Sequence, residues 1–186
     1  MIPGFLIAWA TFPGVMLHEW SHKQACHWRG IRVRNVEWFN LNGSGLVTHD
    51  QPREYMDSVL ISTAPLAVNS VVAIGLWIVT GVALWGSMPG SVPVQSEYIA
   101  IGAGWLALSS GWHAFPSPLD ITNAWSAAVS NWRSSMIAGL LLPALVLMYL
   151  SAKLRILWFD LFYAAGLGVG TFWLISRLGV TPVGGL

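Results

Sequence analysis

Long apolar stretches separated by short polar segments dominate the pattern of the chain. Five of them predict membrane-spanning helices, at about residues 3–28, 58–85, 98–115, 136–150 and 156–175. A shorter segment, residues 121–132, carries Trp125 and Trp132 and predicts a helix lying at the membrane interface. The pattern therefore predicts an all-α polytopic membrane protein, a bundle of about five transmembrane helices.

Residues 31–49 have a different pattern. Polar and apolar residues alternate over several positions, Asn42-Gly43-Ser44-Gly45 is a turn sequence, and Leu46-Val47-Thr48-His49 is extended in character. Two alternating runs joined by such a turn predict a small β-hairpin between the first and second helices. The alternative is an irregular surface loop.

Composition agrees with the membrane assignment. The 186 residues are 55% hydrophobic and 9% charged, with a mean hydropathy of +0.60. A net charge of +1 gives no reason to expect nucleic acid as a partner, and the single cysteine, Cys26, excludes an intrachain disulfide. We expect no cleavable signal peptide, because the N-terminus lacks a basic region and the first apolar stretch carries the candidate chemistry.

The distribution of Lys and Arg predicts the orientation in a cell membrane. Four basic residues follow the first predicted span (Lys23, Arg29, Arg32 and Arg34), whereas residues 86–97 after the second contain none. By the positive-inside rule the N-terminus is outside and residues 23–57 and 116–135 are cytoplasmic. Lys153 and Arg155 conflict with this scheme, since it places them outside.

The first predicted span contains a motif with chemical meaning, His18-Glu19-Trp20-Ser21-His22. On a helix, two His residues at this spacing share one face and can hold one Zn²⁺, and the Glu between them can act as general base on zinc-bound water. The alternative is an ordinary surface helix with a chance match. The apolar surroundings disfavour it, because ionisable residues at membrane depth are costly and usually functional.

A catalytic zinc site usually takes three protein ligands, so a third must come from elsewhere. The candidates are Asp120, His113, His27, His49, Asp160 and Cys26. We favour Asp120, which ends the third predicted span on the cytoplasmic half and follows a proline-broken stretch of the kind that lines cavities in membrane proteins. Alternatively Asp120 is only a helix cap. His113 is the second choice as ligand, and Cys26 is better explained as a small buried residue.

Three segments together resemble the site-2 protease class of intramembrane zinc metalloproteases. Residues 12–22 (FPGVMLHEWSH) resemble its motif helix, residues 64–69 (APLAVN) its Pro-x-x-x-Asn element, and residues 115–120 (FPSPLD) the proline-rich segment that supplies its third zinc ligand. The order of these motifs along the chain also resembles that of a short prokaryotic branch of membrane metalloproteases, which has a Gly-rich hairpin after the motif helix. The resemblance covers about residues 10–125. Two departures stand out: Ile121 replaces the usual Gly after the Asp, and no PDZ-like domain is present.

This resemblance implies a single membrane metalloprotease domain over residues 1–186, with a core of 1–125 and accessory helices at 136–176. It implies that His18, His22 and Asp120 hold zinc and that Asn69 and Pro65 contact substrate. The alternative for Asn69 is an interhelical hydrogen bond. The hairpin would pair with a substrate strand. We therefore expect an intramembrane zinc endopeptidase of a multi-pass membrane protein, acting on transmembrane proteins or peptides, with Glu19 as base and a site that opens toward the cytoplasm. The rival functions are a non-catalytic metal carrier and a substrate-binding scaffold.

Overall fold

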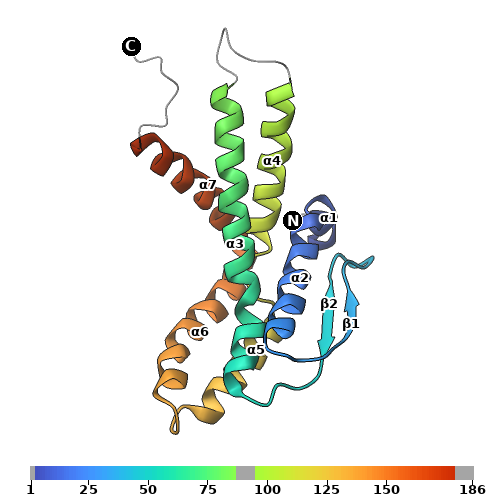
Figure 1. Ribbon diagram of the computed structural model, residues 1–186, viewed down its shortest axis with the longest axis vertical. Coiled ribbons are helices and arrows are strands. Elements are labelled where there is room, and N and C mark those ends of the chain that lie inside the picture. The colour runs from blue at the N-terminus through green and yellow to red at the C-terminus, as the bar shows by residue number, and fades with distance from the viewer. Residues whose placement is uncertain (1–2, 87–94, 179–186) are drawn as a thin grey trace.

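The computed structural model describes residues 3–86 and 95–178, which form seven α-helices and one β-hairpin (Figure 1). The elements in chain order are α1 (Gly4–Ala10), α2 (Phe12–Trp28), β1 (Val33–Glu37), β2 (Leu46–His49), α3 (Tyr55–Gly86), α4 (Gln95–Trp112), α5 (Pro118–Asn131), α6 (Met136–Leu154), the 3₁₀ turn η1 (Arg155–Leu157) and α7 (Phe159–Arg177). The predicted interfacial helix corresponds to α5.

Helix α3 is the axis of the molecule. Its 32 residues run most of the height of Figure 1, with α4 beside its upper half and α2 and α5 beside its lower half. Buried positions around it are often small, such as Ala73, Ala107, Ala124 and Ala128, which lets helices approach closely without large side chains between them.

Three helices in the described ranges are long and apolar enough to cross a membrane. They are Tyr55–Leu84, Met136–Leu154 and Phe159–Arg177, which match the second, fourth and fifth predicted spans. The length and composition of these helices are typical of a membrane protein. The third predicted span corresponds to α4, which is helical but is not among the three.

The first predicted span is not one continuous helix. The chain breaks at Thr11, whose φ of −121° and ψ of 29° are not helical, so α1 and α2 are separate and α2 is only 17 residues long. In Figure 1 the N-terminus and α1 lie near the middle height of α3, and α2 descends from there. Pro13 falls in the first turn of α2, where its missing N–H costs nothing, so it begins a helix rather than bending one.

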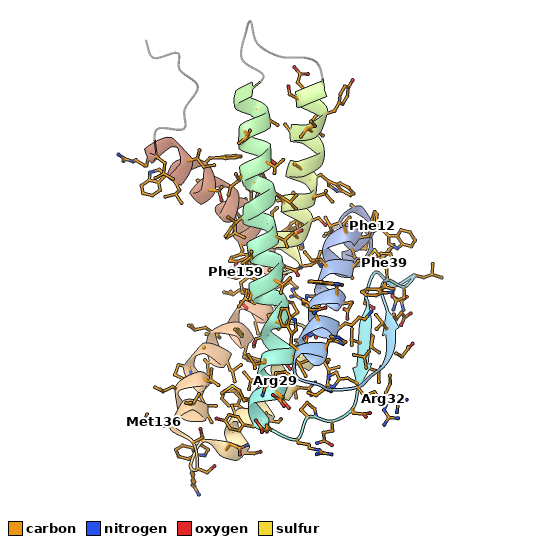
Figure 2. All side chains as sticks on the ribbon, in the orientation of Figure 1. Phe12, Arg29, Arg32, Phe39, Met136 and Phe159 are labelled. Carbon is orange, nitrogen blue, oxygen red and sulfur yellow. The ribbon has the colours of Figure 1, made fainter. Side chains whose placement is uncertain are left out.

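The hairpin predicted for residues 31–49 is confirmed. Strands β1 and β2 pair antiparallel, with Val36 opposite Val47 and Glu37 opposite Leu46. The hairpin lies against α2, and its chain packs Phe39 against the start of that helix: the Phe12 and Phe39 rings are 6.3 Å apart (Figure 2). The position of α2 is thus fixed on one side by the hairpin and on the other by α3.

Helices α6 and α7 are joined end to end by a sharp break. The turn η1 is followed by Trp158 in the left-handed conformation, with φ of 63°. Helix α6 packs on α5 in the lower half of the molecule, whereas α7 packs on α3 and α4 and continues toward the upper left of Figure 1. Residues 153–158 consequently lie at the middle of the molecule and not at one of its ends.

Candidate metal centre

Helix α2 brings the three polar residues of the motif to one buried place. His18, Glu19 and His22 are only 9%, 7% and 6% exposed. Spacing of four residues puts both imidazoles on the same helical face, and their Nε2 atoms are 3.1 Å apart. The motif is therefore not a solvated surface feature, and the surface-helix alternative is excluded.

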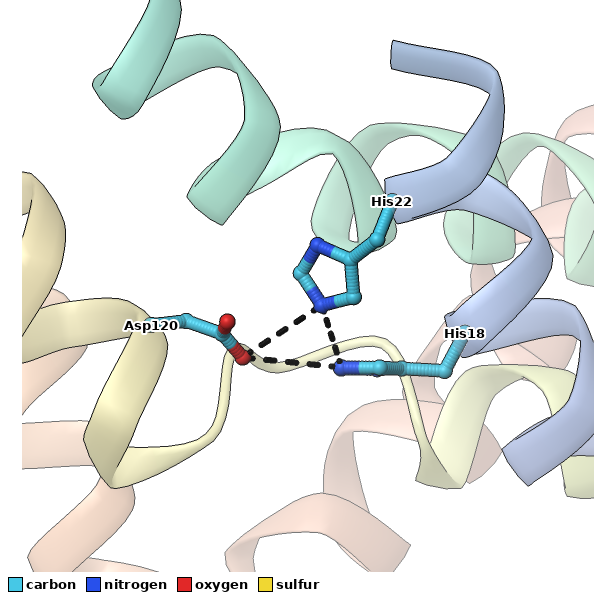
Figure 3. A group of neighbouring side chains, drawn as sticks. All are labelled: His18, His22 and Asp120. Atoms are coloured by element: carbon cyan, nitrogen blue, oxygen red, sulfur yellow. Dashed lines mark hydrogen bonds and ion pairs between the residues drawn. The ribbon is translucent and has the colours of Figure 1, made fainter. Parts of the chain in front are cut away.

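Asp120 reaches the same place from α5, as expected from the sequence. Its Oδ2 atom lies 3.4 Å from His22 Nε2 and 3.7 Å from His18 Nε2 (Figure 3). His18, His22 and Asp120 form the only group of three or more His, Cys, Asp or Glu ligand atoms that could share one metal ion among the described residues.

The distances fit a tetrahedral zinc site. Zinc bonds of about 2.0–2.1 Å place neighbouring ligand atoms about 3.3–3.4 Å apart. The three observed separations of 3.1, 3.4 and 3.7 Å bracket that value. Three protein ligands on one side would leave a fourth position open to the cavity, the pattern of catalytic rather than structural zinc.

Backbone carbonyls orient both imidazoles. His18 Nδ1 lies 2.7 Å from the carbonyl oxygen of His113, and His22 Nδ1 lies 2.8 Å from that of Ile61. A carbonyl only accepts, so each Nδ1 donates, and each neutral ring presents an unprotonated Nε2. Two lone pairs and a carboxylate oxygen then face one small space, an arrangement that a cation stabilises.

Asp120 is both a helix cap and a member of this group. Its Oδ2 accepts a hydrogen bond from Ser117 N (2.8 Å), while Ser117 Oγ accepts one from Asp120 N, so the pair forms a capping box at the start of α5. The cap fixes the position of the Asp120 carboxylate, and Oδ2 keeps a second lone pair that could bind a metal. Ile121, which departs from the pattern of the site-2 protease class, is buried in the first turn of α5, and its backbone does not adopt a positive φ.

The other candidate ligands do not join these three, although His49, His113 and Asp160 line the same cavity. The His113 ring points to Thr11, with Nε2 2.8 Å from Thr11 Oγ1, so His113 contributes its carbonyl and not its imidazole. Cys26 is fully buried against Ala25 and Ile61. His27 is exposed, and His49 lines the cavity at its rim.

Asn69 and Pro65 are both fully buried within the helix bundle, and neither lines the cavity. The Asn69 side-chain nitrogen donates toward three carbonyl oxygens at 3.2 Å, those of Gly14, Ser110 and His113. The His113 carbonyl oxygen also accepts the hydrogen bond from His18 Nδ1. In this conformation Asn69 ties α2, α3 and α4 together, and a direct contact with substrate would require it to leave these carbonyls.

A cavity of about 710 Å³ adjoins the metal group. Its walls include His18, Glu19, His22 and Asp120, the hairpin residues 42–47 and 49, and the α6–α7 break. The hairpin lies close to Glu19: a Cβ added at Gly45 would come 2.9 Å from Glu19 Cδ. Neither this contact nor the two orienting carbonyls has a sequence signal of its own, because all three involve backbone atoms.

Comparison with models of protein families, with curated proteins and with solved structures found no match to this chain.

Proposed function

We propose that this protein is an intramembrane zinc endopeptidase of the kind that the site-2 protease class represents. The observation that carries the proposal is the group of His18, His22 and Asp120 with Glu19 beside it, all on the wall of one cavity. Their side chains come from two helices about a hundred positions apart in sequence, so their convergence is a property of the fold.

Each residue of the group has a role that follows from its chemistry. Zinc supplies Lewis-acid activation of the scissile carbonyl and of water. His18, His22 and Asp120 would hold the metal at the cavity wall, and the carbonyls of His113 and Ile61 keep both imidazoles in the ligating tautomer. Glu19 takes a proton from the attacking water and returns it to the leaving amine.

The hairpin supports a peptide as substrate. A peptide bond in a helix is shielded, so a transmembrane substrate must unwind before hydrolysis. The β1–β2 sheet has only two strands, and Leu46, Val47 and His49 of β2 line the cavity. An unwound segment that adds to this edge regains backbone hydrogen bonds and is held extended past the metal group.

We further propose that the lower end of the molecule in Figure 1 faces the cytoplasm and that the site opens there. Arg29 and Arg32 lie at this end in Figure 2, which agrees with the positive-inside rule. The end-to-end path of α6 and α7 supports this orientation, with which Lys153 and Arg155 otherwise conflict. These residues sit at the break in the middle of the molecule, so they form no external loop. The bundle then has fewer separate crossings than the five expected.

A metal carrier would need several ligand groups along a path through the bundle. The described residues contain one such group, and a general base accompanies it. A scaffold has no use for a base beside a metal group. The geometry thus favours hydrolysis over both rivals.

The test is the substitution Glu19→Gln, which keeps size and hydrogen bonding but removes the base. Purified protein carrying it should bind zinc as the parent does and should lose hydrolysis of a transmembrane peptide by orders of magnitude, because base, metal and water act as a unit. Undiminished cleavage by Glu19→Gln would end the proposal.

A further inference from the structure

The α6–α7 break brings a second charged group to the cavity. Arg155 and Lys153 line it, together with Asp160 from the first turn of α7. None of them belongs to the metal group. A broken helix with charged residues at the middle of a membrane protein is expected only where it lines a cavity, and such residues are usually functional.

Aromatic contacts fix this break beside the metal centre. The Trp158 ring packs on Trp112 at the end of α4 with 5.8 Å between centroids, and Phe159 packs on Phe115 at 5.3 Å. Between Trp112 and Phe115 lies His113, whose carbonyl orients His18. The segment that positions the metal ligands is therefore the same segment that holds the α6–α7 break.

Arg155 keeps free hydrogen-bond donors beside its ion pair. Its Nε donates to Asp160 Oδ2 at 2.6 Å, and within the described ranges this is the one hydrogen bond or ion pair of its guanidinium. Asp160 is 2% exposed, whereas the Arg155 side chain is 43% exposed. The Nη edge of the guanidinium is thus left without a protein partner, and two parallel N–H groups on one edge match a carboxylate.

We propose that Arg155, with Lys153 as a second positive charge, forms a subsite for a substrate carboxylate next to the metal centre. This inference rests on the proposed function, because it takes the ligand of the cavity to be a peptide substrate. It adds which class of peptide the cavity selects. Asp160 holds the guanidinium from the buried side and leaves its outer edge for the ligand. The carboxylate has two chemical sources, an acidic side chain near the scissile bond or a free peptide C-terminus.

Peptide binding tests the subsite without relying on turnover. Full-length, zinc-loaded protein with Glu19→Gln is placed in phosphatidylcholine vesicles, and labelled transmembrane peptides are titrated by energy transfer from Trp. The peptides share one apolar sequence and an amidated C-terminus, with a single Glu or Gln scanned through the central positions. A third peptide with Gln and a free C-terminal carboxylate identifies the other source.

At one or a few positions the Glu peptide should bind about 10- to 100-fold more tightly than its Gln partner, the range for a bidentate charged pair. Adding Arg155→Gln together with Asp160→Asn should lower that ratio at least several-fold, toward what Lys153 alone supports, while zinc content stays unchanged. The paired change removes both charges and so leaves no uncompensated buried carboxylate. Arg133→Gln, an exposed cation outside the cavity, is the matched control and should keep the preference.

A Glu preference that the paired change does not lower, or no carboxylate preference in any peptide, overturns the subsite. Preference for the free C-terminus alone assigns the carboxylate to a chain end. A parent protein that binds with the expected preference but cleaves no peptide refutes the proposed function and leaves the subsite standing.

Discussion

Gly45, just before β2, lies with its backbone directly against the side chain of Glu19 on α2. A Cβ at position 45 would come 2.9 Å from Glu19 Cδ and equally close to the carbonyl oxygen of Glu37. A side chain at this position would therefore be crowded by α2 and by β1. The hairpin turn therefore limits where the Glu19 side chain can lie. It can position the candidate base through its backbone, without contributing a side chain.

Gly45→Ala should displace the Glu19 carboxylate while leaving the metal ligands in place. We expect peptide hydrolysis to fall by about 10-fold or more, since small misplacements of a catalytic group are costly, with zinc content near that of the parent. The control is Gly75→Ala in α3, where an added Cβ meets nothing within 4 Å. Equal activity of the two variants would show that the turn yields to the extra methyl group and does not position the base.

The double role of Asp120 can be separated by substitution. Asp120→Asn keeps an oxygen that accepts from Ser117 N, and so keeps the cap, but it loses the charge that a metal ligand needs. Ser117→Ala removes half of the capping box and should cost about 1 kcal/mol of stability with zinc retained. Zinc analysis of purified protein should give about one ion per chain for the parent and for Ser117→Ala, and much less for Asp120→Asn. The reverse order would leave Asp120 as a cap only.

Asn69 distinguishes positioning from substrate binding. Its buried amide holds the His113 carbonyl that orients His18, so Asn69→Leu should lower zinc affinity by about 10- to 100-fold, as for other groups that orient metal ligands. Competition with a chelator measures this directly. Ser70→Ala is the matched control on the next residue of α3, because its hydroxyl contacts Tyr163 and not the metal centre. A raised KM with unchanged zinc affinity would instead restore the substrate-binding role that the resemblance implies.

Sequence pattern predicted those features that depend on side-chain type and spacing. The turn residues 42–45 with alternating flanks marked the hairpin, and the spacing of His18 and His22 marked the metal face. Asp120 was placed by the proline-broken stretch before it. The end-to-end path of α6 and α7 was not predicted, since it depends on tertiary packing. Hydropathy counts apolar residues but does not tell whether two apolar helices lie side by side or in line.

The orientation in the membrane can be read by labelling single cysteines in a Cys26→Ser background. Cys26 is fully buried, so its removal exposes no new surface. Arg53→Cys, before α3, and Ser134→Cys, between α5 and α6, should both label from the cytoplasmic side, because the basic residues after α2 mark that side. Glu97→Cys, in the first turn of α4, should label only from the opposite side, since α3 separates the two ends. All three positions are exposed, so failure to label reports the membrane and not burial in the protein.

Labelling of Arg53→Cys and Glu97→Cys from the same side would contradict a crossing by α3. Labelling of all three from sides opposite to those expected would keep the crossing and reverse the orientation, and the metal centre would then open away from the cytoplasm.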